Sequence, residues 1–189
     1  GSRDYPDSRT LAAVFEGSGG ALDGATWRDH TSFTVRCHPT RIAPVLHALA
    51  DMLISPRFVE IYIEKHVIDE ELASDTDDNG HDTDITNISR KAIWGEDPMG
   101  RRVGGASDVI KQLTVHDLRI HHARYYVGNN MALCIAGPCE LDALETLVRH
   151  AYHALPSGVS QPPPTSPLFG PRSPEHARKH EDNGQLEIL

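Results

Sequence analysis

Apolar positions recur along the chain with two different spacings, and each spacing predicts a different element. In the segment HTSFTVRC, Phe33, Val35 and Cys37 alternate with polar residues, which predicts a strand with one buried face. A second, less regular strand is expected just upstream, over residues 22–28. The run MALCIAG, residues 131–137, is apolar throughout and predicts a short strand in the middle of a sheet.

Longer segments repeat their apolar residues every three or four positions and therefore predict amphipathic helices. Serine and threonine before these repeats mark helix starts, and glycine or proline after them marks helix ends. The predicted helices cover residues 8–16, 40–54, 57–74, 85–93, 107–113 and 140–155, and another begins at Thr114.

The composition changes near residue 156, where proline, serine and glycine become frequent. Such a stretch is typical of a linker between folded parts. A length of 189 residues suits one domain with a core and a tail. We expect a domain over residues 1–158, a Pro-rich linker over 159–175, and the start of a following domain or a tail over 176–189. The final GQLEIL resembles the first strand of a further unit.

The charge balance excludes two classes of partner. The net charge of −9 argues against nucleic acid, whose phosphates are bound by lysine and arginine, and against anionic membrane surfaces. No apolar run approaches the roughly 18 residues that suggest a membrane-spanning helix. We therefore expect a soluble chain, and the sequence leaves both cytoplasm and periplasm open as its compartment.

A pair of acids is the main candidate for chemistry. Glu64 and Glu71 lie seven residues apart in IEKHVIDEEL, which is close to two helical turns, so both carboxylates project from one helical face. Such a pair is either a solvated acidic face or the acidic part of a metal site. Glu70 competes with Glu71 for this role, and the spacing to Glu64 favours Glu71. Neither H-x-x-E-H nor H-E-x-x-H occurs in the sequence.

Five segments, in this order, are similar to the N-terminal domain of the pitrilysin/insulinase family of zinc metallopeptidases, the inverzincins. They are FEGSGGALDGATWRDHT, LADMLISPRF, IEKHVIDEEL, WGEDPMGRRVGG and LTVHDLRIHHARYYVGNNMALCIAG. The resemblance covers roughly residues 1–158. The family's H-x-x-E-H helix normally lies just before a Gly-Thr or Gly-Ser pair, and this chain begins with Gly1 and Ser2. The sequence is compatible with two explanations. Either the zinc-binding helix has been removed, or Gly1 and Ser2 are the remnant of a tag.

The resemblance implies specific roles for two regions. Glu71 resembles the third zinc ligand, and Glu64 resembles an acid that orients a ligand histidine. A third region resembles the edge strand on which the family binds its substrate as an added strand, through backbone groups. It consists of Asp23, Gly24, Ala25 and Thr26. An ordinary turn containing a glycine would explain these four residues equally well.

The resemblance also implies a fold and an activity. The expected fold is α+β, a two-layer domain of mostly antiparallel sheet with helices packed on one face. The parent protein would be a zinc metalloendopeptidase that cleaves peptides or unfolded segments, with a second homologous domain or subunit as partner. This chain alone, without catalytic residues of its own, is expected to hold no zinc and to be inactive. Its incomplete sheet predicts self-association through an exposed edge.

Three alternatives stay open at this level. A non-catalytic family member would keep the fold and act as a scaffold or a substrate clamp. The segment DTDDNG, residues 75–80, matches the first half of a calcium loop but lacks its final glutamate, so a solvated acidic loop is the simpler interpretation. Arg101 and Arg102 are expected to form an exposed basic pair, or else a clamp for an anionic group.

Overall fold

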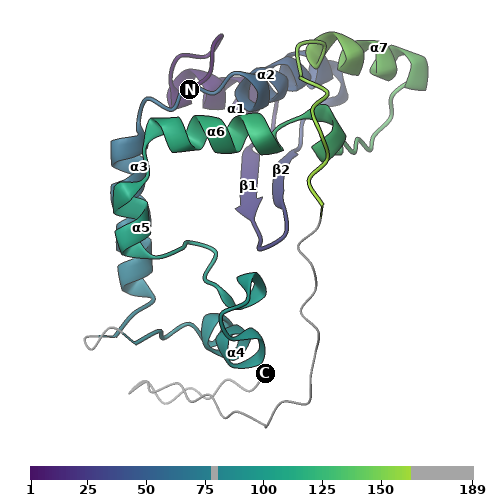
Figure 1. Ribbon diagram of the computed structural model, residues 1–189. Helices are drawn as coiled ribbons and strands as arrows, with labels where there is room; N and C mark the ends of the chain where they lie inside the picture. Colours follow the sequence, from purple (N-terminus) through teal and green to yellow (C-terminus); the bar gives the residue numbers. More distant parts are fainter. Residues whose placement is uncertain (78–80, 163–189) are drawn as a thin grey trace. The chain divides into compact units, whose positions relative to one another are not determined.

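The computed structural model describes residues 1–77 and 81–162, which divide into two compact units (Figure 1). Unit 1 comprises Gly1–Ala25, Thr31–Val59 and Thr114–Pro162. The described part of unit 2 comprises Thr26–His30 and Glu60–Leu113. None of the described helices combines the length and the apolar composition needed to cross a bilayer.

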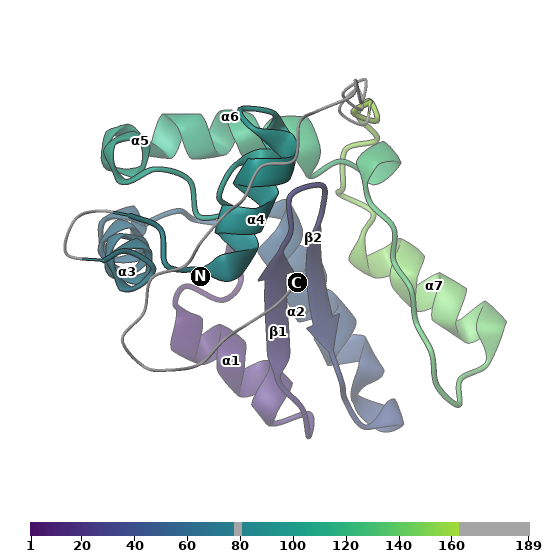
Figure 2. The ribbon, with the colours of Figure 1, turned by 90° about the horizontal axis from the view of Figure 1, so that it is seen from below.

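Unit 1 is built on a helical core with a hairpin against it. Its elements are α1 (Ser8–Glu16), β1 (Leu22–Thr26, whose last residue belongs to unit 2), β2 (Thr31–Val35), α2 (Ile42–Ile54), α6 (Val115–Tyr125), α7 (Leu141–Ala151) and 3-10 turns at Pro39–Arg41 and Gly128–Asn130. The core joins α1 to α2 through buried apolar side chains, among them Phe15, Ala48 and Leu49. Phe33 and Val35 of β2 pack against this core, and Figure 2 shows the hairpin beside α2.

Unit 2 carries the acidic helix. Its elements are α3 (Ile61–Ser74), α4 (Ile85–Trp94), a 3-10 turn at Pro98–Gly100 and α5 (Ser107–Gln112). Only Leu72 is buried in α3. Gly104 lies against that side chain, where an added Cβ would be 3.0 Å from Leu72 Cδ2 and would require that side chain to shift.

The prediction of an α+β fold is consistent with the structure, but the prediction of a mostly sheet domain is wrong. The described residues contain one sheet, the two antiparallel strands β1 and β2, and helices predominate. Residues 131–137 do not form the predicted central strand. A strand exists only where a neighbour exchanges backbone hydrogen bonds with it, and no described segment bonds to the backbone of residues 132–136.

The helix boundaries were predicted more closely. Thr114 caps α6 with its side chain, and its partner Asp117 completes a capping box. Helix α1 covers the predicted residues 8–16, and the side chain of Asp7 caps it. The largest shifts are of four residues: α3 begins at Ile61 rather than residue 57, and α7 ends at Ala151 rather than residue 155. Just before α3, Phe58 has φ 49°, a left-handed conformation that a helix cannot contain.

The first residues of the chain are part of unit 1. Ser2 is fully buried and its N–H donates to the Tyr5 carbonyl at 2.6 Å. Arg57 N–H donates to the Gly1 carbonyl at 3.1 Å. The buried carboxylate of Asp51 on α2 accepts from the backbone N–H of Asp4 at 2.8 Å. These bonds fix the N-terminal segment onto α2.

Candidate functional site

The four acidic residues of α3 have different surroundings. Asp69 accepts a short hydrogen bond from the Ser107 hydroxyl, and its carboxylate lies 3.2 Å from Lys111 Nζ. These two contacts with α5, the Ser107 bond first, lower the pKa of Asp69 from its ordinary value. Asp69 therefore connects α3 to α5.

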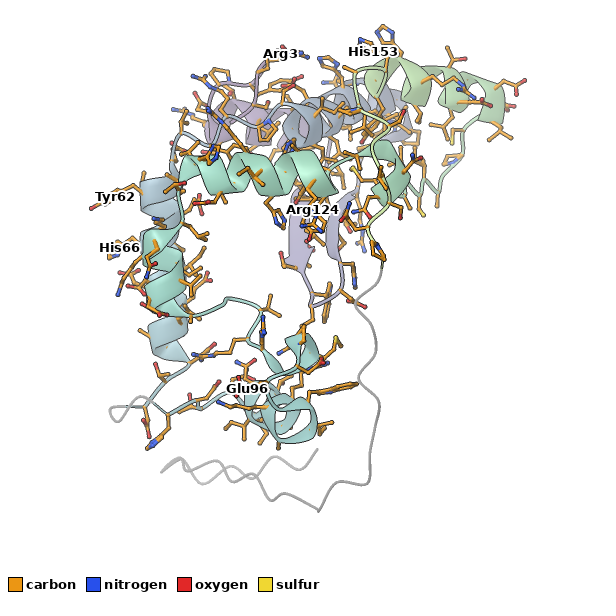
Figure 3. All side chains as sticks on the ribbon, in the orientation of Figure 1. Arg3, Tyr62, His66, Glu96, Arg124 and His153 are labelled. Atoms are coloured by element: carbon orange, nitrogen blue, oxygen red, sulfur yellow. The ribbon has the colours of Figure 1, made fainter. Side chains whose placement is uncertain are left out.

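The other three acids include the predicted site residues. Glu70 lies 3.5 Å from His66 Nε2, one helical turn earlier. Glu64 and Glu71 are exposed, and their carboxylates form no hydrogen bond or ion pair with any residue in the described ranges. Tyr62 and His66 project outward from α3 in Figure 3, and their helical positions are opposite those of the two free glutamates. The structure thus distinguishes Glu71 from its competitor Glu70.

A cavity of about 140 Å³ lies within unit 2, beside the C-terminal half of α3. Glu71 and Leu72 line it from the helix, and Asp75, which caps the helix, lines it at the end. Asn87 and Arg102 contribute to its lining from α4 and from the segment before α5. Of the predicted site residues, only Glu71 lines this cavity.

Arg102 connects the end of α3 to the acidic segment that follows it. Its Nη2 atom lies 3.7 Å from the Asp75 carboxylate and donates to the Asp75 carbonyl at 3.3 Å. Its Nε atom lies 3.0 Å from the Asp82 carboxylate. The side chain is only 25% exposed, so the prediction of an exposed basic pair is wrong for Arg102. The remaining part of the calcium-like motif, residues 78–80, lies outside the described residues.

The predicted substrate strand coincides with most of β1. Asp23, Gly24 and Thr26 are exposed, and Ala25 is partly buried. Within the described sheet β1 pairs only with β2, so its other edge has no strand partner there. The structure does not place Glu64 or Glu71 relative to Leu22–Ala25, which belong to the other unit.

The turn after β1 is fastened within unit 2. Trp27 N–H donates to the His30 carbonyl at 2.8 Å and closes the turn. Arg28 donates from Nη2 to Asn87 Oδ1 at 3.2 Å and from Nε to the Arg101 carbonyl at 3.0 Å. Sequence analysis missed Arg28 and Asn87. Neither belongs to a motif, and their bond joins positions 59 residues apart.

These side chains do not form a complete metal centre. No group of three or more His, Cys, Asp or Glu side chains that could hold a metal occurs in the described parts of the chain. A catalytic zinc takes three protein ligands and keeps one position for water. Glu71 fits one such ligand because its carboxylate is free, but the described residues do not supply the other two.

Comparison with known proteins identifies the family. Residues 1–106 match the family model described as insulinase, peptidase family M16. The chain belongs to this family. Residues 112–189 match a second model, described as peptidase M16 inactive domain. The predicted resemblance to the pitrilysin/insulinase family is therefore confirmed, and with it the assignment to a family of zinc metalloproteases.

The curated relatives are longer than this M16 chain. An uncharacterized zinc protease of Mycobacterium tuberculosis is 26% identical over 144 residues, which is 75% of this chain and 32% of the relative. Cytochrome b-c1 complex subunit 1 of Bos taurus is 26% identical over 157 residues, 82% of this chain and 32% of that subunit. The chain thus spans about a third of the length of the curated relatives it matches.

Solved structures agree on the fold. The M16 inactive domain from Pseudomonas fluorescens superposes with a TM-score of 0.74 at 19% identity, covering 86% of this chain and 40% of that one. Pitrilysin gives a TM-score of 0.69 at 20% identity, covering 90% of this chain and 19% of that one. These solved structures therefore show the fold of an M16 domain for this chain.

Proposed function

We propose that this chain is part of a zinc-dependent metalloendopeptidase that cleaves peptides or unfolded segments. The observation that carries the proposal is the pair Glu64 and Glu71, the two acids of α3 that have no partner among the described residues, with Glu71 lining a cavity.

The chain would contribute one zinc ligand and part of the substrate-binding surface. Glu71 would give a carboxylate oxygen to the zinc, and Glu64 would orient an imidazole supplied by an H-x-x-E-H segment outside the printed sequence. Zinc in such a site supplies an activated water for attack on a peptide carbonyl. Because the described residues do not complete the ligand set, the isolated chain is proposed to be inactive.

The peptide would add as a strand to the free edge of β1, at Asp23, Gly24, Ala25 and Thr26. The open edge and the exposure of three of these residues support this role. Backbone hydrogen bonds would supply the affinity, which suits substrates of varied sequence. The greater length of the relatives supports a second, homologous domain as the partner that completes the enzyme.

The decisive experiment compares two adjacent glutamates in the full-length protein. Glu71→Gln should remove bound zinc and lower kcat/KM by more than about 100-fold, since loss of a ligand costs at least as much as loss of the group that supports it. Glu70→Gln, the matched control, should leave both unchanged. The proposal fails if Glu71→Gln retains zinc and activity.

A non-catalytic scaffold or substrate clamp is the second candidate. It is favoured by the similarity to a subunit of the cytochrome b-c1 complex. The coding sequence upstream of Gly1 separates the two candidates. An H-x-x-E-H segment there supports the enzyme, and its absence, together with a zinc-free full-length protein, supports the scaffold.

We also propose a division into domains and self-association of the chain. Residues 1–158 would form the folded domain, 159–175 the linker, and 176–189 the beginning of another unit or a tail. The free edge of β1, together with the backbone of residues 132–136, which bonds to no described segment, would recruit a second copy. Light scattering that finds only monomer at high concentration would exclude self-association.

A further inference from the structure

The turn that follows the proposed substrate strand contains one partly buried side chain. Trp27 N–H donates to the His30 carbonyl at 2.8 Å and closes the turn. Arg28 and Asp29 lie between these two residues, at the tip of the hairpin. Arg28 is partly buried, whereas its three neighbours in the turn are exposed. It lies two residues after Thr26, the last residue of β1, and both belong to unit 2.

The guanidinium of Arg28 donates to two separate segments of unit 2. Nη2 donates to Asn87 Oδ1 on α4 at 3.2 Å, and Nε donates to the Arg101 carbonyl at 3.0 Å. Both acceptors are neutral, so these bonds depend on where the two N–H groups lie rather than on pairing of charges. The planar guanidinium holds its donors in a fixed fork, whereas the ammonium of a lysine is a single centre on a flexible stem.

The two acceptors are themselves held in place. Asn87 N–H donates at 2.8 Å to the side chain of Asp84, the residue that caps α4. Arg101 directly follows the 3-10 turn at Pro98–Gly100. That turn lies close to the end of α4, since a Cβ added to its last residue would be 2.3 Å from the Gly95 carbonyl oxygen. Arg28 therefore bonds to acceptors that the fold has already positioned.

The order of an edge strand determines how well it binds a peptide. The backbone groups of β1 that would pair with the peptide lose on binding whatever freedom they keep beforehand, and this loss lowers the affinity. A hairpin of two strands is only marginally stable by itself. β1 has five residues, and within the described sheet its other edge has no strand partner. A bond that fastens the tip of this hairpin would therefore prepare the strand for its substrate.

We propose that Arg28 is a positioning residue for substrate binding: its two hydrogen bonds fix the end of β1 in the extended form with which a peptide can pair. Arg28 acts through the backbone of Thr26 and Trp27 and need not touch the peptide. This inference rests on the proposed function, because it assumes that the peptide adds to β1, but it does not depend on the metal. The competing role is a brace that only stabilises unit 2, and it makes different predictions.

The test measures binding of a fluorescein-labelled, unstructured peptide to the full-length protein by fluorescence anisotropy, with Glu71→Gln present to prevent cleavage. Arg28→Lys keeps the charge but loses the fork, and it should raise the Kd about 10-fold, the cost of ordering roughly one backbone residue on binding. Arg101→Lys makes the same replacement at an exposed neighbour that accepts through its carbonyl, and it should leave the Kd unchanged. An Arg28→Lys protein that binds the peptide as tightly as its parent overturns the proposal.

A second variant tests whether the bond to α4 carries the effect. Asn87→Ala removes one of the two acceptors and should also raise the Kd. The double variant with Arg28→Lys should bind no more weakly than Arg28→Lys alone, because both changes remove the same bond. Losses that multiply in the double variant would contradict the proposal.

The fraction of protein that binds separates positioning from a brace. A brace would lower the melting temperature and the fraction of molecules that bind the peptide, but it would leave the Kd of the folded molecules unchanged. Far-UV circular dichroism and the stoichiometry of the titration measure both quantities. A lower binding fraction with an unchanged Kd would assign Arg28 to the fold and overturn the proposal.

The results also separate this inference from the proposed function. If Glu71→Gln removes zinc and activity while Arg28→Lys leaves the Kd unchanged, the proposed enzyme stands and this inference falls. If Glu71→Gln retains zinc and activity, the proposed metal ligand is wrong, and KM from initial rates takes the place of Kd in the same comparison. If the full-length protein binds no peptide, this inference is overturned, whereas the zinc content alone decides the metal site.

Discussion

Helices α2 and α3 are nearly equal in length, thirteen and fourteen residues, yet they are held in place by different forces. Seven residues of α2 are buried, whereas Leu72 is the single buried residue of α3. The sequence of α2 is therefore constrained mainly by packing. The sequence of α3 is constrained by polar contacts on one side and leaves another side without described partners.

The contacts of α3 with α5 are polar and mostly exposed. Lys65 Nζ donates to the Lys111 carbonyl at 2.8 Å, and Asp69 binds Ser107 and Lys111. Away from these contacts, Val67 lies three residues after Glu64 and four before Glu71, so it shares their side of the helix, and it is 43% exposed. An apolar side chain between two free acids is consistent with a surface that a further segment covers in the proposed enzyme.

The largest expected effect on stability comes from truncating one apolar side chain in each helix. Leu49→Ala in α2 should lower the free energy of unfolding by about 3 kcal/mol, because it removes buried methyl groups and leaves a cavity. Ile63→Ala in α3 should change it by less than about 0.5 kcal/mol, because that side chain is 56% exposed. Urea denaturation followed by far-UV circular dichroism measures both. Equal losses would show that α3 is packed as α2 is, contrary to the comparison.

The sequence predicted both the buried and the exposed helices, because nearby residues in the sequence mark where each helix begins and ends. The Thr114 capping box and the apolar repeat of α2 involve residues within a few positions of one another. Spacing also predicted that Glu64 and Glu71 share one helical face, whereas their roles were implied by the family resemblance. Spacing also favoured Glu71 over Glu70, and the structure adds that Glu70 is the acid that lies near His66.

What could not be predicted depends on residues distant in sequence. Residues 131–137 have the composition of a central strand, but composition does not supply a neighbouring strand, and the described chain has none there. The pairing of Arg102 with Asp75 spans 27 residues. The excess of acids in residues 75–84 was the available signal that a nearby arginine would be used.

The next effect is a pH dependence confined to the α3–α5 contact. The pKa of Asp69 is lowered in the folded chain, so its stabilising contribution is present above the unfolded pKa, about 3.9, and is lost as the pH falls through the lower folded pKa. Asp69→Asn should therefore lower the melting temperature at pH 6, and the difference from wild type should shrink as the pH falls below about 4. Asp108→Asn, in the first turn of α5, is the matched control. A difference that does not depend on pH would contradict this account.

The smallest effects should differ in sign between two neighbouring glutamates. Glu70→Gln breaks an exposed pair with His66 and should destabilise this chain by no more than about 0.5 kcal/mol. Glu71→Gln removes an unpartnered negative charge from the last turn of α3, where the helix dipole is unfavourable to anions, and should stabilise the chain by about 0.3–0.5 kcal/mol. Melting curves at low ionic strength resolve the two shifts.

A stabilising Glu71→Gln that also abolishes zinc binding in the full-length protein would mean that Glu71 is kept for function at a cost to stability, as expected of a site residue. A destabilising Glu71→Gln would instead assign that carboxylate to the fold.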